Sequence, residues 1–113
     1  MKDLPMRKLE LTLQLQITLP QGRFKLNGLL YTVRRAAGEI LCLITATILE
    51  AIQGREIQLL KTRDPKRYLR NGYQSRPRRF EASFGTVQVK MAQVVDRKTG
   101  RCFCPFERAV EFT

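Results

Sequence analysis

Residues 9–19 alternate between apolar and polar side chains without interruption. Leucine or isoleucine fills every odd-numbered position of this stretch, and polar residues fill the even-numbered positions between them. A repeat of two residues is that of an extended strand with one buried face, whereas an amphipathic helix repeats every 3.6 residues. The pattern therefore predicts a half-buried strand over 8–19, ended by the turn sequence Pro20-Gln21-Gly22.

The repeat becomes helical between about Lys25 and Leu60. This predicts an amphipathic helix over about 25–60, continuous or broken near Gly38 or Gly54, because glycine weakens helices. We expect its apolar stripe to face the core, and the alternative is a seam through which two helices pair in a dimer. The residues of the stripe follow one another at steps of three, four or seven: Leu26, Leu30, Val33, Ala37, Ile40, Ile44 and Ala51.

Residues 61–79 show no regular repeat. Asp64-Pro65 predicts the end of the helix, because proline disfavours the helical conformation in the residue before it. Asn71-Gly72 and Ser75-Arg76-Pro77 are turn sequences. We therefore expect a basic loop over 61–79.

Alternation of apolar and polar residues returns over 80–106, which predicts a β-hairpin region. Asp96 to Gly100 has the composition of a hairpin loop. Cys102, Cys104 and Phe106 would share one side of a last short strand, which Pro105 would restrict to a sheet edge. The order of a strand, a long helix, a basic loop and antiparallel hairpins predicts a single α+β domain over 1–113.

The charge of the chain is high and regional. The 113 residues contain 21 Lys and Arg, 10 Asp and Glu and no His, which gives a net charge of +11. A local surplus of cations is typical of a surface that binds a polyanion, above all nucleic acid, although charge can also serve solubility alone. The cations of residues 61–101 are the expected phosphate contacts: Lys61, Arg63, Lys66, Arg67, Arg70, Arg76, Arg78, Arg79, Lys90, Arg97, Lys98 and Arg101.

Two tyrosines, Tyr68 and Tyr73, lie among these cations. Tyrosine rings can stack on bases or sugars, which makes both residues candidates for stacking. Alternatively, each ring covers the sheet while its hydroxyl holds a backbone group. The pattern is equally compatible with DNA and RNA.

Residues typical of catalysis or metal binding are scarce. Histidine, the commonest general base and metal ligand, is absent, and the three aspartates, Asp3, Asp64 and Asp96, lie far apart. Cys102 and Cys104, together with Cys42, provide one ligand fewer than a structural zinc site needs. We expect no enzymatic activity, no metal and no cofactor.

The sequence also indicates where the protein acts. An odd number of cysteines without a secretory signal favours a reducing, cytoplasmic location. The longest apolar run, residues 40–52, is shorter than the ~20 residues that span a bilayer, so we expect no membrane partner.

Several short motifs follow one another along the chain: Arg63-Asp64-Pro65-Lys66-Arg67-Tyr68, Gly72-Tyr73, Phe84-Gly85-Thr86-Val87, Asp96 to Gly100 and Pro105-Phe106. Their order resembles the N-terminal region of a family of bacterial insertion-sequence transposases. Two positions depart from the family pattern. Thr86 stands where the family usually has an acid, and Lys90-Met91-Ala92-Gln93 stand where it tends to have Arg and Tyr.

The resemblance implies a non-catalytic module that binds double-stranded DNA, as in recognition of a transposon end. In the family this region precedes a DDE catalytic domain, and we expect these 113 residues to lack the carboxylate-bearing sheet that two-metal phosphoryl transfer needs. A possible partner of the helix is a second copy of the chain or a transposase catalytic partner. Two alternatives stay open: a protein-interaction or oligomerisation module that uses the 25–60 helix, and a remnant fragment of a transposase without activity of its own.

Overall fold

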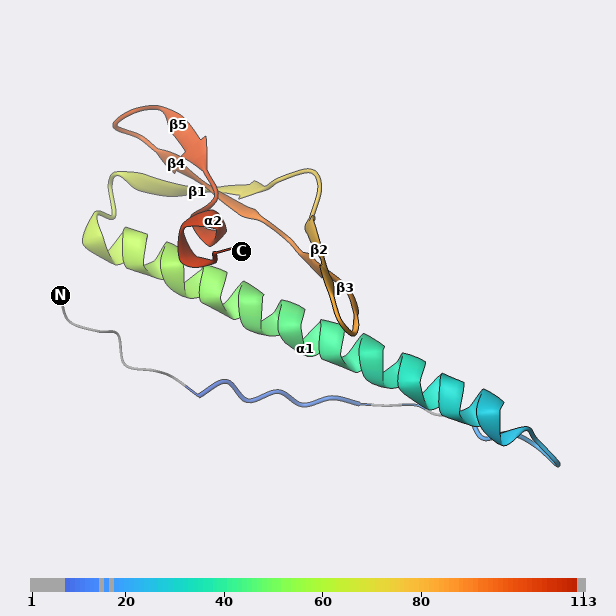
Figure 1. The fold of residues 1–113 in the computed structure, drawn as a ribbon. Coiled ribbons are helices and arrows are strands. Elements are labelled where there is room, and N and C mark those ends of the chain that lie inside the picture. Colours follow the sequence, from blue (N-terminus) through green and yellow to red (C-terminus); the bar gives the residue numbers. More distant parts are fainter. Residues whose placement is uncertain (1–7, 15, 17, 112–113) are drawn as a thin grey trace.

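The computed structural model describes residues 8–14, 16 and 18–111. One long helix is followed by antiparallel strands in two small sheets, which is the predicted α+β class (Figure 1). The elements are α1 (Leu26–Arg63), β1 (Tyr68–Tyr73), β2 (Arg78–Ala82), β3 (Gly85–Val89), β4 (Ala92–Asp96), β5 (Arg101–Phe103) and α2 (Pro105–Ala109).

Helix α1 is continuous over 38 residues, which corresponds to a length of about 57 Å. It is the helix predicted over about 25–60, extended to Arg63, and it is not broken at Gly38 or Gly54. It ends at Asp64, whose backbone has left the helical region (φ −150°, ψ 85°) although its N–H still donates to the Leu60 carbonyl at 3.1 Å. Pro65 follows directly, in accordance with the stop signal in the sequence.

The described residues of the range 8–19 do not form the predicted strand, and for them this prediction was wrong. The described residues of the segment have no regular secondary structure, and residues 15 and 17 lie outside the description. An alternating sequence forms a strand only where a neighbouring strand supplies backbone hydrogen-bond partners. Within the described chain, both sheets consist of β1 to β5 and none of these strands pairs with the segment.

The basic loop predicted over 61–79 is largely regular structure. Residues 61–63 complete α1, residues 68–73 form β1, and Arg78 begins β2. β1 pairs with β4 in the register Tyr68↔Asp96, and a bulge between Arg70 and Tyr73 shifts the pairing. The bulge contains Gly72 (φ 66°) and hides the alternation of the strand, so the local sequence did not indicate β1.

The strands β1 to β4 follow the course of one long antiparallel ribbon that is interrupted in the middle. β2 and β3 pair across a turn at residues 83–84, and β1 pairs with β4. At the interruption, residues 74–77 lie opposite only two residues, Lys90 and Met91, and the Gln74 N–H donates to the Met91 carbonyl at 2.8 Å. β5 then pairs with β4 across the predicted hairpin loop, in which the Asp96 carbonyl accepts hydrogen bonds from Thr99 and Gly100.

The last strand ends earlier than predicted, at Phe103. Pro105 is the first residue of α2 instead of part of an edge strand, because its fixed φ and missing N–H suit the first position of a helix. Phe106 is therefore buried on α2, and Cys102 and Cys104 do not share one side of a strand.

The core lies between α1 and the ribbon, but it does not use the stripe of α1 that the sequence analysis assigned to it. At 100° per residue, the sheet-facing residues and the predicted stripe lie on largely opposite sides of the helix. Leu26, Leu30 and Val33 of that stripe are 62, 54 and 57 % exposed. The α1 residues that contact the sheet or its core instead are Gly38, Cys42, Ala46, Leu49, Gln53 and Ile57.

Two close contacts explain why this weaker face packs against the sheet. A Cβ atom at Gly38 would lie 2.7 Å from the Phe84 carbonyl oxygen, so only glycine lets the ribbon's turn approach α1 this closely. The buried Gln53 side chain donates to the Lys90 carbonyl at 2.9 Å and accepts from the Ala92 N–H at 3.0 Å. Gln53 thus supplies one hydrogen bond to the link between β3 and β4 and one to the first residue of β4, where the ribbon is interrupted.

Candidate nucleic-acid interface

An open depression of about 680 Å³ lies where α1 leads into β1 and beside the loop between β4 and β5. We call it the basic depression. Its lining residues come from two segments about thirty positions apart: Asp64, Lys66, Arg67, Arg97 and Lys98. The pairing of β1 with β4 brings these segments together, and the Arg97 N–H donates to the Arg67 carbonyl at 2.8 Å.

A bidentate ion pair holds the two segments in place. The Arg67 Nε and Nη2 atoms donate to Asp96 Oδ1 and Oδ2, both at 2.9 Å. The pKa of Asp96 is lowered from 3.8 to about 2, chiefly by the hydrogen bond from Arg67 and in part by the Lys98 N–H, 3.0 Å from Oδ1, against the opposing effect of burial. Arg67 therefore positions the loop that carries Arg97 and Lys98.

Three cations of the basic depression remain unpaired by carboxylates. Lys66, Arg97 and Lys98 are exposed and take part in no ion pair with any described residue. Lys61 and Arg63 belong to the last turn of α1, shortly before Lys66, and Arg101 begins β5 directly after the loop. These six residues give one end of the molecule a surplus of positive charge.

The arginines at 76, 78 and 79 do not form the single cluster that their sequence positions suggest. Arg78 lies opposite the buried Val89, on the side of the ribbon that faces α1, and pairs with Glu107 at 3.7 Å. Arg79 lies opposite Gln88 on the other side, because consecutive strand residues point to opposite faces. Arg76 lies in the interruption of the ribbon.

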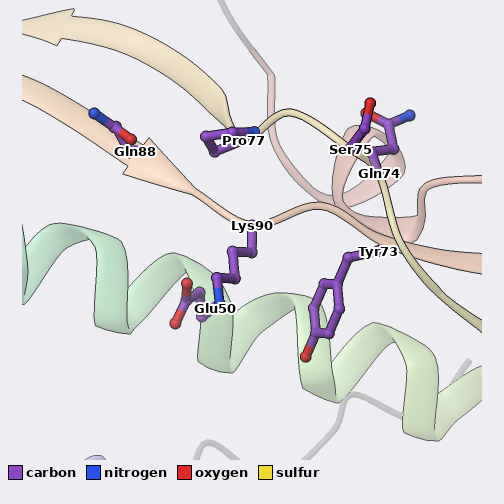
Figure 2. A pocket seen from close by; sticks show the side chains of 7 residues that line it. All are labelled: Glu50, Tyr73, Gln74, Ser75, Pro77, Gln88 and Lys90. Atoms are coloured by element: carbon purple, nitrogen blue, oxygen red, sulfur yellow. The ribbon is translucent and has the colours of Figure 1, made fainter.

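Arg70 and Lys90 lie next to Tyr73 and not in the basic depression. The guanidinium of Arg70 is 4.6 Å from the centre of the Tyr73 ring, and the Lys90 amine is 6.0 Å from it. Figure 2 shows Tyr73 and Lys90 pointing from the ribbon toward α1, on which Glu50 lies, around a pocket of about 340 Å³. The twelve predicted contacts therefore divide among three parts of the molecule.

The two tyrosines have different surroundings. The half-buried Tyr68 ring packs edge-to-face against Phe103, with centroids 6.1 Å apart, and contacts the cluster of Ile57, Ala92 and Val94. This arrangement favours the covering role over base stacking for Tyr68. Tyr73 is 56 % exposed and keeps a ring face near Arg70.

Sequence reasoning missed Gln53 and Arg108. Positions 49, 53 and 57 follow one another at spacing four and so share one face of the helix. The glutamine between Leu49 and Ile57 on this face was a signal that position 53 meets a polar partner in the core. Arg108 lies over the Phe103 ring, 3.9 Å from its centre, and adds a cation outside the predicted set. Its position on α2 was hidden by the assignment of residues 104–106 to a strand.

The thiols and carboxylates of the described residues are dispersed. No group of three or more His, Cys, Asp or Glu that could hold a metal ion occurs in this part of the chain. The Cys42 thiol donates to the Phe84 carbonyl at 3.9 Å, and burial raises the pKa of Cys104. Both cysteines thus pack against the core.

By length and composition alone, α1 contains a stretch apolar enough to cross a membrane. Core helices of soluble proteins share this property but are mostly buried, whereas only 6 % of this stretch is buried. The expected lack of a membrane partner stays a prediction.

Comparisons with protein-family models, with curated proteins and with solved structures gave no match for this chain. The likeness to insertion-sequence transposases therefore rests on the order of the short motifs alone.

Proposed function

We propose that this protein binds nucleic acid without catalysis, and that the basic depression is the centre of the binding surface. The observation that carries the proposal is the convergence of Lys66, Arg97 and Lys98, from two distant segments, around one open depression. The carboxylate of Asp96 is already matched by Arg67, which leaves these three charges available to phosphates.

The shape and lining of the depression support a phosphate backbone over a small molecule as ligand. Small-molecule pockets are concave and mostly apolar, whereas all five residues that line this depression are charged. Loop cations at an open surface contact phosphates irrespective of base sequence. The resemblance to transposases favours double-stranded DNA.

The test is fluorescence anisotropy of a labelled DNA duplex at several salt concentrations. We expect log affinity to fall with log salt by roughly 0.9 per phosphate contact. The triple variant Lys66→Glu, Arg97→Glu, Lys98→Glu should bind far more weakly and reduce this slope by roughly 2.7. Circular dichroism checks that the variant keeps its fold.

A matched control carries the same change of charge at the other end of α1. The control variant carries Arg23→Glu, Lys25→Glu and Arg34→Glu. It alters exposed cations at least roughly 44 Å of helix away from the depression and should retain most of the affinity. A third variant, with glutamate at positions 76, 78 and 79, measures the contribution of the ribbon. Equal losses of affinity in all three variants would mean that only generic charge is involved. So would displacement of the labelled duplex by polyglutamate as effectively as by unlabelled duplex.

A second candidate function is that of an oligomerisation module. It is favoured by the exposed apolar residues of α1, and it is compatible with binding of nucleic acid at the opposite end of the helix.

A further inference from the structure

The side of α1 away from the sheet is apolar and exposed. We call it the outer face, and its residues are Leu26, Leu30, Val33, Leu41 and Ile48, which are 62, 54, 57, 45 and 42 % exposed. Exposed apolar surface of this kind often marks a site of interaction with another molecule. The outer face is therefore a candidate for such a site.

Residues 8–14 add to this surface. In Figure 1 they are drawn on the side of α1 opposite the sheet, and Leu9, Leu11 and Leu13 are 49, 38 and 41 % exposed. The backbone groups of residues 8–14 take part in no hydrogen bond with the described chain. An alternating extended segment with unpaired backbone groups is a ready partner for another strand.

The charge distribution indicates which partner fits. The chain carries +11, yet the five residues of the outer face are uncharged, and residues 8–14 hold one cation, Lys8, and one anion, Glu10. Two like-charged copies repel each other least where both present a surface without net charge. An acidic partner would gain more at the basic depression, where Lys66, Arg97 and Lys98 converge, than here, where Arg34 borders the face.

We infer that the outer face of α1, together with residues 8–14, is the interface with a second copy of this chain. A two-fold symmetric dimer needs a surface that is complementary to itself, and an uncharged apolar face meets this condition. The segments of the two copies pair as antiparallel strands beside the packed helices. Pairing supplies the backbone partners that the predicted strand lacks within one chain.

The available area is at the lower end of that of a specific dimer. The outer face runs from Leu26 to Ile48, about 33 Å of helix, and with a width of roughly 10 Å it presents roughly 330 Å². Residues 8–14, extended over roughly 23 Å, raise this to roughly 560 Å² per partner, or roughly 1,100 Å² in total, against the roughly 1,000 Å² that a specific interface exceeds.

A lipid bilayer fits this surface less well than a second copy. Hydrocarbon offers no hydrogen-bond partner to the unpaired backbone of residues 8–14, and each unsatisfied group in it costs several kcal/mol. A strand from a second copy satisfies these groups.

The experiment is sedimentation equilibrium of the full chain over a wide range of concentration, at low salt and at about 1 M salt. We expect a species of twice the 13.1 kDa chain mass. This dimer should persist at about 1 M salt, because the Debye length there is about 3 Å and the repulsion between the two positively charged copies is screened. Hydrogen exchange at the same concentrations should find the amides of residues 8–14 protected in the dimer and unprotected after dilution.

Two variants locate the interface. Leu30→Glu should weaken dimerisation by about 100-fold or more, because it buries an unpaired carboxylate from each copy. Leu69→Glu makes the same change on the opposite side of the sheet from α1, at a leucine that is 45 % exposed, and should leave the dimer intact.

A monomer at every concentration would overturn the inference, and so would a dimer that loses affinity equally in both variants or whose 8–14 amides stay unprotected. Binding of a monomeric chain to phosphatidylserine–phosphatidylcholine vesicles would assign the surface to a membrane. None of these results depends on the basic depression, so the proposal of nucleic-acid binding can stand or fail separately.

Discussion

The two faces of α1 differ in a way that hydrophobicity does not explain. The face that packs against the sheet includes Gly38, Cys42, Ala46 and Gln53, which are small or polar, whereas the outer face carries larger aliphatic residues and stays exposed. The richer apolar stripe is therefore not the one in the core of the chain. Close approach and hydrogen bonding decide which face a sheet accepts.

The comparison can be tested most strongly by removing one side chain from each region. Phe106→Ala, at a fully buried position on α2, should lower the free energy of unfolding by about 3–5 kcal/mol. Leu30→Ala on the outer face should change it by less than about 0.5 kcal/mol in the monomer, because its side chain already meets water. Urea denaturation at a concentration below dimerisation measures both values, and similar losses would mean that the two regions contribute alike to the fold.

Gln53 tests whether hydrogen bonding selects the packed face. Gln53→Leu keeps the volume but leaves the Lys90 carbonyl and the Ala92 N–H without partners, which should cost about 1–3 kcal/mol of the free energy of unfolding. Hydrogen exchange at the Ala92 amide should become faster. Gln58→Leu, on the exposed side of the same helix, is the control and should be close to neutral. A neutral Gln53→Leu would contradict the role given to this side chain.

Two glycines of α1 separate close approach from helix propensity. Gly38→Ala places a Cβ atom against the Phe84 carbonyl, 2.7 Å away, and should destabilise the protein by about 1–3 kcal/mol. At Gly54 a Cβ atom meets nothing within 4 Å, so Gly54→Ala should stabilise the helix by about 0.5–1 kcal/mol. Thermal denaturation reveals the sign of each change, and a stabilising Gly38→Ala would show that the turn of the ribbon does not need this contact.

The ion pair between Arg67 and Asp96 at the basic depression should stabilise the protein only while the Asp96 carboxylate is ionised. The pKa of Asp96 is lowered in the fold, so its carboxylate stabilises the protein above its ordinary pKa of 3.8, and this stabilisation is lost as the pH falls toward about 2. Asp96→Asn should lower Tm at neutral pH and reduce the loss of Tm between about pH 4 and pH 2. Melting curves of both proteins across this range provide the test.

Glu39→Gln is the control for Asp96, because it removes an exposed pair with Arg35. It should change Tm little at neutral pH. A Tm of the Asp96→Asn variant that equals the wild-type value at pH 7 would exclude a structural role for the ion pair.

Local sequence patterns predicted much of the element order but not the partners of each element. The periodicity and the Asp64-Pro65 stop predicted α1, and the composition of residues 96–100 predicted the β4–β5 loop. β1 was missed because the bulge at Gly72 interrupts its alternation, and its assignment depends on pairing with β4. Residues 8–19 show the converse, a clear strand pattern with no neighbouring strand in the described chain.

The candidate site shows the same division. Composition indicated a cationic region, yet it did not distinguish Lys66, Arg97 and Lys98, which converge, from Arg67, which is paired with Asp96. Nor did it separate Arg78 from Arg79, because their sides of the ribbon follow from the register with β3.

The sequence by itself determined the helix, its stop, the position of the main hairpin loop and the regional surplus of charge, since each depends on neighbouring residues or on composition. Only the tertiary structure decided which face of α1 is packed, which cations meet and which strand pairs are formed. These outcomes depend on contacts between residues tens of positions apart, where a missing Cβ at Gly38 or two hydrogen bonds of Gln53 outweigh a more regular apolar stripe.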